Sequence, residues 1–176
     1  TGISIMKINK ELDSGPVCNT YKIDITEKDN TETVSEKLSL LASEKILDNI
    51  DDILNEKASF KDQDHSQATY ANKIQKSEGK IDWKNSAESI IGKINGLYPS
   101  PGAWFIFNGE RYKVLEAEIS NTSGNFGIVL DDHLKIGCGN KSVKILSIQR
   151  EGKKSQKVDE FMLGSQIKKG FNLNNA

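Results

Sequence analysis

Residues 103–119, which read AWFIFNGERYKVLEAEI, predict a β-hairpin. Two runs rich in aromatic and aliphatic residues flank Asn108-Gly109, and this dipeptide between apolar runs is the strongest short-range hairpin signal. Three more short strands are expected, at 126–130, 134–138 and 142–148. Several short strands with tight turns predict a small β-barrel, and a short helix is expected to follow at 157–163.

A helix is expected just before this barrel. Asn85 and Glu88 have the spacing of a helix start, and Gly96 is placed to close the helix. The apolar stripe of this helix consists of Ile90, Ile91, Ile94 and Leu97.

Residues 1–60 have a different pattern, typical of a mixed α/β structure. Strands are expected at 3–8 and 17–25, and a long helix from Val34 that would cover one face of the sheet. Asn30, Thr31 and Thr33 are possible caps, and Thr33 with Glu36 matches a capping box. The polar stretch 61–84 is interpreted as a linker to a second domain at 85–176. The opening strand pattern, without an initiator Met, suggests that the chain begins inside a domain.

Composition narrows the possible classes of protein. With 36% hydrophobic and 28% charged residues and a mean hydropathy of −0.53, the chain reads as globular rather than disordered. No apolar run reaches the roughly 18 residues of a membrane-spanning helix. Residues 1–70 carry 8 Lys and Arg against 14 Asp and Glu (8 − 14 = −6), whereas residues 71–176 carry 16 against 11 (16 − 11 = +5). This asymmetry favours a polyanionic partner for the second half, although a solvated basic surface gives the same pattern.

The cysteines and histidines indicate neither a disulfide nor a metal site. Cys18 and Cys138 lie far apart, which favours a reducing cytosol, and with His65 and His133 they show no zinc-ligand spacing. No metal is expected.

Three pairs of stretches, in this order and covering nearly the whole chain, resemble the methionyl-tRNA formyltransferase family. They are TGISIM (1–6) with LDSGP (12–16), ATYANKI (68–74) with IDW (81–83), and YPSPGAW (98–104) with IQREGKK (148–154). The resemblance implies an α/β + β fold class: the tail end of a Rossmann-like formyltransferase domain, followed by an OB-like small β-barrel. It also implies that the family's active-site Asn and His, and its folate loop, lie upstream of residue 1.

The resemblance implies transfer of a formyl group from 10-formyltetrahydrofolate, as co-substrate, to the amino group of initiator Met-tRNA. Asp13 matches the family's catalytic Asp, and Gly15 and Pro16 would shape the loop near the folate. From local sequence alone, Asp13 before Ser-Gly-Pro is more simply a turn-former. The residues present here are expected to be inactive without the upstream side chains, and the full-length enzyme is expected to be a cytoplasmic monomer.

Two sets of cations are candidate tRNA contacts, although exposed charges of this kind often form only a solvated surface. The first set is Arg150, Lys153, Lys154 and Lys157, with Lys168 and Lys169; the second is Lys73, Lys76 and Lys80 in the linker. The aromatic residues could stack on bases, but packing is favoured because they carry a large apolar area into a small core. These aromatic residues are Tyr70, Trp83, Tyr98, Trp104, Phe105 and Phe107.

Two other functions fit the same residues. One is a folate-dependent formyltransferase that acts on an amino-sugar nucleotide, and the other is an RNA-binding OB-like module without catalysis. The Gly-Lys-Lys segment 152–154 and the basic balance of residues 71–176 favour tRNA.

Overall fold

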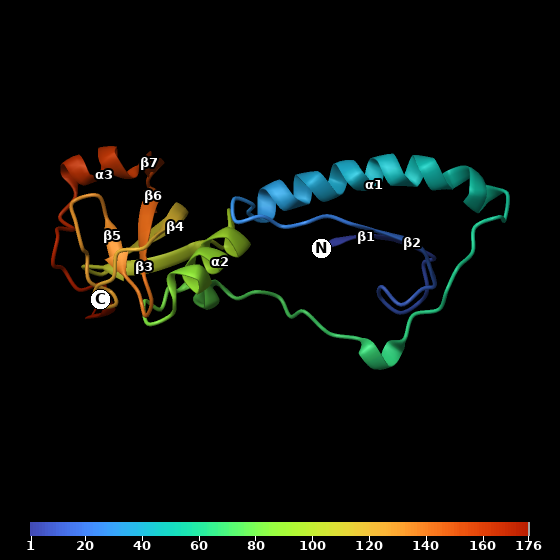
Figure 1. The fold of residues 1–176 in the computed structure, drawn as a ribbon, viewed down its shortest axis with the longest axis horizontal. Helices are drawn as coiled ribbons and strands as arrows, with labels where there is room; N and C mark the ends of the chain where they lie inside the picture. The colour runs from blue at the N-terminus through green and yellow to red at the C-terminus, as the bar shows by residue number, and fades with distance from the viewer. Residues whose placement is uncertain (176) are drawn as a thin grey trace. The chain divides into compact units, whose positions relative to one another are not determined.

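The computed structural model describes residues 1–175 and divides into two compact units, Thr1–Lys73 and Ile74–Ala176. They are called unit 1 and unit 2 below. Figure 1 shows the elements of both units in chain order.

Unit 1 contains one antiparallel strand pair and one long helix. Strand β1 (Gly2–Met6) pairs with β2 (Val17–Lys22), and helix α1 (Thr31–Leu54) packs against β1. A single 3₁₀ turn, η1 (His65–Gln67), follows the helix. The expected strand pair and helix are confirmed, with β1 and β2 shorter than predicted.

The start of α1 differs from the predicted capping box. The N-cap is Asn30, whose Oδ1 accepts a hydrogen bond from the Thr33 backbone N at 3.0 Å, while the Thr33 hydroxyl accepts one from the Asn30 N at 3.0 Å. The pairing of Thr33 with Glu36 was therefore wrong. The box therefore begins three residues earlier than predicted, with the Asn30 and Thr33 side chains each accepting the backbone N–H of the other residue.

Unit 1 leaves much of its apolar surface in contact with solvent. Throughout Thr1–Lys73, all of which the structure describes, no apolar side chain is buried. Leu12 and Ile8 are more than 90% exposed, and Leu47 and Leu54 more than 70%. Unit 1 has one layer of two strands and one layer with a single helix. Two such small layers cannot enclose a core between them.

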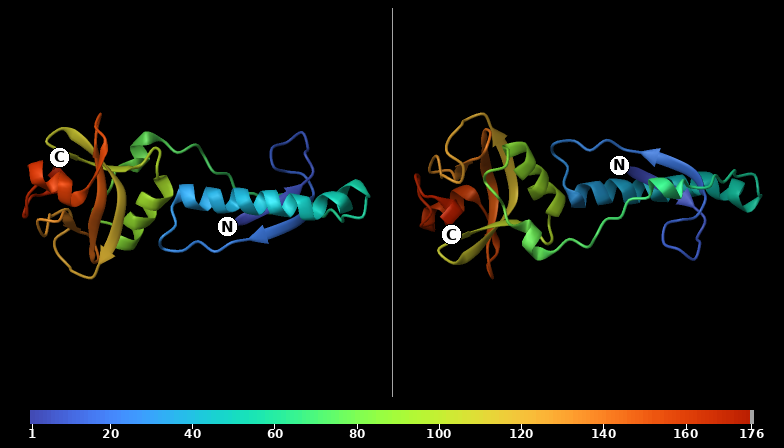
Figure 2. Two further views of the ribbon diagram at one scale, coloured as in Figure 1. Left: turned by 90° about the horizontal axis from the view of Figure 1, so that it is seen from above. Right: turned by 90° about the horizontal axis from the view of Figure 1, so that it is seen from below.

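Unit 2 is built on a five-stranded antiparallel sheet that curls into a half-barrel. The strand order is β3-β4-β6-β5, with β7 also pairing with β6. The strands are β3 (Ala103–Phe107), β4 (Glu110–Ser120), β5 (Lys135–Gly137), β6 (Ser142–Arg150) and β7 (Ser155–Lys157). The helical segments are η2 (Lys76–Gly79), α2 (Ala87–Leu97), α3 (Val158–Gly164) and η3 (Leu173–Asn175). Figure 2 shows α2 and α3 on opposite sides of the sheet.

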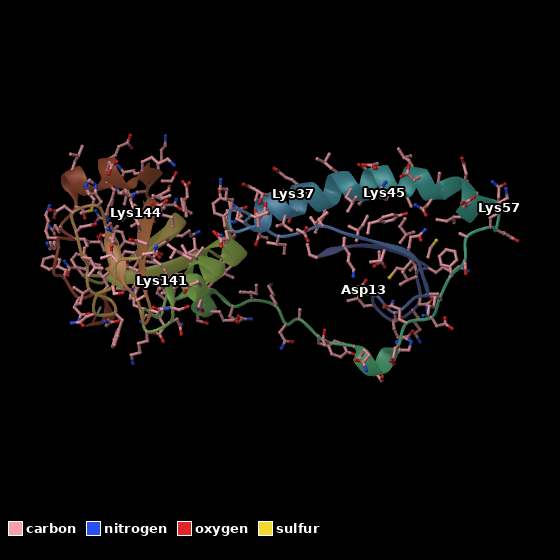
Figure 3. All side chains as sticks on the ribbon, viewed as in Figure 1. Asp13, Lys37, Lys45, Lys57, Lys141 and Lys144 are labelled. Carbon is pink, nitrogen blue, oxygen red and sulfur yellow. The ribbon has the colours of Figure 1, made fainter. Side chains whose placement is uncertain are left out.

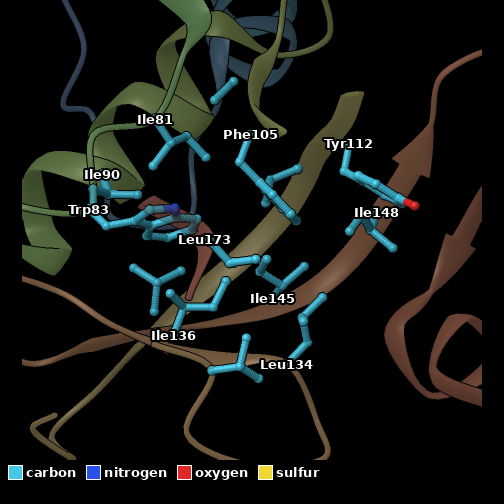
Figure 4. Packing of buried hydrophobic residues seen from close by; sticks show 14 of the residues in the cluster. Ile81, Trp83, Ile90, Phe105, Tyr112, Leu134, Ile136, Ile145, Ile148 and Leu173 are labelled. Atoms are coloured by element: carbon cyan, nitrogen blue, oxygen red, sulfur yellow. The ribbon is translucent and has the colours of Figure 1, made fainter. Parts of the chain in front are cut away.

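The core of unit 2 lies between the curled sheet and α2 (Figure 4). The Trp83 ring meets Phe105 edge-on at 5.9 Å between centroids, and Phe105 stacks on Tyr112 at 5.6 Å. Trp104 is 8% exposed, and its Nε1 donates to the Lys76 carbonyl at 3.0 Å. Packing is thus confirmed for Trp83 and Trp104, whereas Tyr70 in unit 1 is 91% exposed.

The hairpin around Asn108-Gly109 is confirmed in detail. Asn108 and Gly109 have φ values of 51° and 76°, the two left-handed residues that a type I′ turn requires. The turn sets the register in which Phe107 faces Glu110 and Ala103 faces Val114.

Three predicted details of unit 2 are wrong. Residues 126–130 form no strand: Ile128 and Val129 make only isolated bridges, and Gly127 has a φ of 73° that interrupts an extended run. The helix before the barrel is capped by Ser86 rather than Asn85, and Gly96 lies within α2, which ends at Leu97. The backbone at Tyr98 is extended because Pro99 follows it, and this ends the helix without a glycine.

Candidate functional site

The Asp13 loop, residues 7–16, joins β1 to β2. Asp13 has a left-handed backbone with a φ of 52°, which aspartate tolerates better than most residues. Its side chain is exposed and is labelled in Figure 3. The Ser14 hydroxyl donates to the Glu11 carbonyl at 3.0 Å within the same turn. The carboxylate is therefore presented at the surface by an ordered loop.

The two ends of the Asp13 loop are held tightly together. The Lys7 backbone N donates to the Pro16 carbonyl at 3.0 Å. Gly15 is buried, and a Cβ at this position would collide with the Lys7 carbonyl. Only glycine fits here, so the LDSGP sequence has a steric role in addition to its turn propensity.

Gln63, which lies outside the Asp13 loop in sequence, holds the loop by two hydrogen bonds. Its Nε2 donates to the Asp13 carbonyl at 2.9 Å and to the Gly15 carbonyl at 2.7 Å. The neighbouring Lys61 exchanges two backbone hydrogen bonds with Val17, at 2.8 and 2.9 Å. Sequence reasoning treated this stretch as an unpatterned linker, because a single glutamine in a polar run carries no periodic signal.

In unit 2 the structure divides the basic cluster predicted near residue 150. Arg150, Lys153 and Lys154 line one open groove of about 760 Å³, together with residues of the β3–β4 hairpin and α3. This groove is called the basic groove below. Lys157 lines a separate groove of about 790 Å³ that also contains Glu116 and Lys144.

The other predicted cations do not line the basic groove. Lys76 lies in η2, where its carbonyl accepts the Trp104 indole N–H, and Lys73 is the last residue of unit 1. Lys168 and Lys169 are exposed beyond α3, and Lys80 is exposed at the end of η2.

The cations of the cluster differ in their partners. Arg150 forms an ion pair with Glu110, which raises the pKa of the guanidinium and lowers the pKa of the Glu110 carboxyl. Lys157 pairs with Glu116 at 2.9 Å, and this hydrogen bond raises the pKa of Lys157. Within residues 1–175, no carboxylate lies within 4.0 Å of Lys153 or Lys154. The two lysines of the β6–β7 turn are thus available to an anion.

The aromatic wall of the basic groove is partly covered. Tyr112 is 7% and Phe107 is 9% exposed, while Phe161 is half-buried and meets Tyr112 edge-on at 5.8 Å. The lining of the groove therefore combines three cations with largely buried aromatic side chains and with the carboxylates of Glu110 and Glu160.

The described residues give no support to metal or thiol chemistry. No group of three or more His, Cys, Asp or Glu side chains that could hold a metal occurs in the described part of the chain. Burial raises the pKa of Cys138 to about 11, which makes this thiol a poor nucleophile at neutral pH. Nor does any described helix have the length and apolar character needed to cross a membrane.

Comparison with known proteins places the sequence among formyltransferases. A family model described as "Formyl transferase, C-terminal domain" matches residues 73–166. The methionyl-tRNA formyltransferase of Pelagibacter ubique is 61% identical over 177 residues, covering 100% of this chain and 57% of that protein. The chain thus spans little more than half the length of this curated relative.

Two solved structures share the fold. HypX from Aquifex aeolicus, in complex with tetrahydrofolic acid, superposes with a TM-score of 0.72 at 16% identity, over 93% of this chain and 30% of that one. The methionyl-tRNA formyltransferase of Clostridium thermocellum gives a TM-score of 0.53 at 21% identity, over 70% and 52%. The family model covers more than half of the chain, and the chain belongs to the formyl transferase C-terminal domain family.

Proposed function

We propose that this chain is the carboxy-terminal part of a methionyl-tRNA formyltransferase, which transfers a formyl group from 10-formyltetrahydrofolate to the amino group of initiator Met-tRNA. The observation that carries the proposal is the 61% identity, along the whole chain, with a relative of that name. The presented carboxylate of Asp13 in unit 1 and the basic groove in unit 2 support it.

In the proposed reaction, the neutral amine of methionine attacks the formyl carbon, and the bond from that carbon to N10 of the folate breaks. The amine loses a proton and N10 gains one, leaving formyl-Met-tRNA and tetrahydrofolate. The negative charge of Asp13 would orient the family's active-site His or relay the amine proton through water. Gly15 and Pro16 would set the loop that faces the folate.

For unit 1 we propose that residues 1–60 complete a Rossmann-like domain. Apolar side chains that remain partly or largely exposed support this, because they line a groove of about 700 Å³ formed by Ile5 of β1, Ile46, Ile50 and Ile53 of α1, and Phe60. A further sheet layer would cover them, as the layered architecture of an α/β domain requires. In this arrangement residues 61–84 are the linker, and residues 85–176 are the OB-like tRNA-binding domain.

For unit 2 we propose that the basic groove contacts tRNA phosphates. Lys153 and Lys154 are the principal contacts, because no carboxylate of the described residues lies within 4.0 Å of either ammonium. Arg150 would contribute once Glu110 is displaced, and Lys157 in the neighbouring groove once Glu116 is displaced. Lys73 and Lys76 remain separate candidate contacts in the linker. Contacts of this kind are independent of sequence and weaken with salt.

Asp13→Asn in the intact protein tests the proposed reaction. Asparagine also tolerates a left-handed backbone, so the loop is retained while the charge is lost. We expect formyl transfer to fall by about 10²- to 10⁴-fold, with unchanged circular dichroism. Asp132→Asn, at an exposed hairpin tip, is the matched control. Near-normal turnover of the Asp13 variant would show that this residue only shapes the loop.

The acceptor is tested by offering Met-tRNA and an amino-sugar nucleotide to the same enzyme. Formylation of Met-tRNA at the higher kcat/KM is the expected result. A preference for the amino sugar would replace the proposed substrate while keeping the reaction class.

We also expect the intact protein to be a monomer in the cytoplasm. Sedimentation measures its oligomeric state, and cell fractionation measures its location.

A further inference from the structure

We propose that Glu110 is a selectivity-determining residue of the basic groove, because its carboxylate holds the Arg150 guanidinium that an RNA phosphate must capture. The proposal rests on the proposed function, in which this groove binds tRNA, and it assigns a role to a residue that sequence reasoning did not single out.

Glu110 is fixed in the groove by two donors from different strands. It is the first residue of β4, directly after the Asn108-Gly109 turn, and Arg150 is the last residue of β6. One carboxylate oxygen pairs with Arg150, and the other accepts the Tyr112 hydroxyl at 2.9 Å. The backbone register sets Tyr112 opposite Arg150, so the three side chains are brought together by the pairing of β4 with β6.

The basic groove therefore contains two kinds of cation. Among the residues that the structure describes, Lys153 and Lys154 have no carboxylate within 4.0 Å, and Glu110 attracts Lys153 only at longer range. Arg150, in contrast, is directly paired with Glu110, whose charge itself repels phosphate. Both partners remain solvent-accessible, with 47% of the Arg150 and 41% of the Glu110 side chain exposed, so the pair can open without unfolding the sheet. An exposed ion pair of this kind is weak enough to be exchanged.

This arrangement makes binding depend on the fit of the RNA. A polyanion that contacts only Lys153 and Lys154 gains little binding free energy and is still repelled by the Glu110 carboxylate. An RNA whose backbone enters the groove can replace Glu110 on Arg150 by a bidentate phosphate contact, which is stronger than a neutral hydrogen bond. The Glu110 carboxylate therefore weakens the binding of RNAs that fit the groove poorly, and repulsion of wrong partners is a common source of specificity.

Another ion pair in the same two strands provides a matched control. Glu118 of β4 lies opposite Lys144 of β6, and their side chains pair at 3.0 Å. Glu110→Gln and Glu118→Gln each remove one negative charge and free one cation from its partner. Only the first lies in the basic groove, and glutamine at 110 can still accept the Tyr112 hydroxyl.

The experiment measures binding of the intact protein to an initiator tRNA transcript and to a short RNA duplex of unrelated sequence, over a range of salt. We expect Glu110→Gln to tighten binding of the duplex by about three- to tenfold and to reduce the preference for tRNA. It should also steepen the salt slope by about one, since one more phosphate is neutralised. Glu118→Gln should change both affinities by less than about twofold. Equal effects of the two variants, or no effect of Glu110→Gln, would overturn the proposal.

A third variant separates this inference from the proposed function. Lys153→Gln combined with Lys154→Gln should weaken both RNAs and flatten their salt slopes. If it does so while Glu110→Gln has no effect, the groove binds RNA and the role of Glu110 is wrong. Should the double variant bind both RNAs normally, the basic groove is not the RNA site.

Discussion

At the scale of single residues, the Asp13 loop depends on contacts from distant parts of the chain. Position 15 requires glycine because a Cβ would collide with the Lys7 carbonyl. The Gln63 side-chain amide donates hydrogen bonds to the carbonyls of Asp13 and Gly15. Asp13 is therefore presented by three residues that perform no chemistry themselves. A candidate catalytic carboxylate needs this support, since small displacements of reacting groups cost large factors in rate.

Gln63→Ala is expected to loosen the loop without removing any reacting group. In the intact protein kcat for formyl transfer should fall by about 10- to 100-fold while KM changes little, and the amides of residues 13–15 should exchange faster. Gln67→Ala, on an exposed residue of η1, should match the parent protein. A change in KM alone would mean that Gln63 acts in binding rather than in positioning Asp13.

At the scale of elements, the start of α1 is organised around one carboxylate. Asp29 is 7% exposed and accepts hydrogen bonds from the backbone N and the hydroxyl of Thr26, both at 2.9 Å. The Lys37 ammonium lies 2.5 Å away. The Lys37 hydrogen bond, followed by those from Thr26, holds the pKa of Asp29 far below its ordinary value of 3.8. The same carboxylate faces the positive end of the helix dipole.

The stability of α1 should consequently depend on pH in the acid range. Because the folded pKa is depressed, the contribution of Asp29 is complete above 3.8 and is lost as the pH falls through and below that value. Asp29→Asn should lower the urea midpoint of the helix signal at neutral pH and flatten its fall in acid. Asp24→Asn, on an exposed residue between β2 and α1, should retain the acid dependence. An unchanged acid profile in the Asp29 variant would contradict this assignment.

At the scale of the whole molecule, the two units hold their structure by different means. Unit 2 buries a continuous apolar cluster that includes Trp83, Phe105 and Ile145, whereas unit 1 buries no apolar side chain. Unit 1 instead relies on caps, backbone pairs and the network in which Asn49 donates to Tyr21 at 2.8 Å. Both tryptophans of the sequence lie in unit 2, so tryptophan fluorescence reports on that unit.

Ile145→Ala should destabilise unit 2 by about 2–5 kcal/mol, because the side chain is fully buried and its removal leaves a cavity. The measurement is the urea midpoint of tryptophan fluorescence. Leu163→Ala, at a position that is 90% exposed, should change the free energy of unfolding by no more than about 0.5 kcal/mol. A loss below about 1 kcal/mol at Ile145 would mean that the core collapses around the gap.

The sequence by itself determined the elements whose signals are local. Asn108-Gly109 between two apolar runs specified a hairpin, and spacings of three and four specified two helices, because turn geometry and helix periodicity act over a few residues. The family resemblance also came from the sequence, because short motifs in a fixed order can be recognised without knowing which residues are in contact. Local signals failed at residues 126–130, where an apolar run with Gly127 makes single bridges instead of a strand.

Only the tertiary structure decided which side chains meet. Gln63 reaches back 50 residues to Asp13, and Glu110 pairs with Arg150 across 40 residues, while Lys157 separates from the cluster with which it was grouped. Such partners depend on strand register and on how the chain returns to itself. A hydrogen bond or an ion pair leaves no periodic trace in the residues between its two ends, so spacing along the chain could not reveal these contacts.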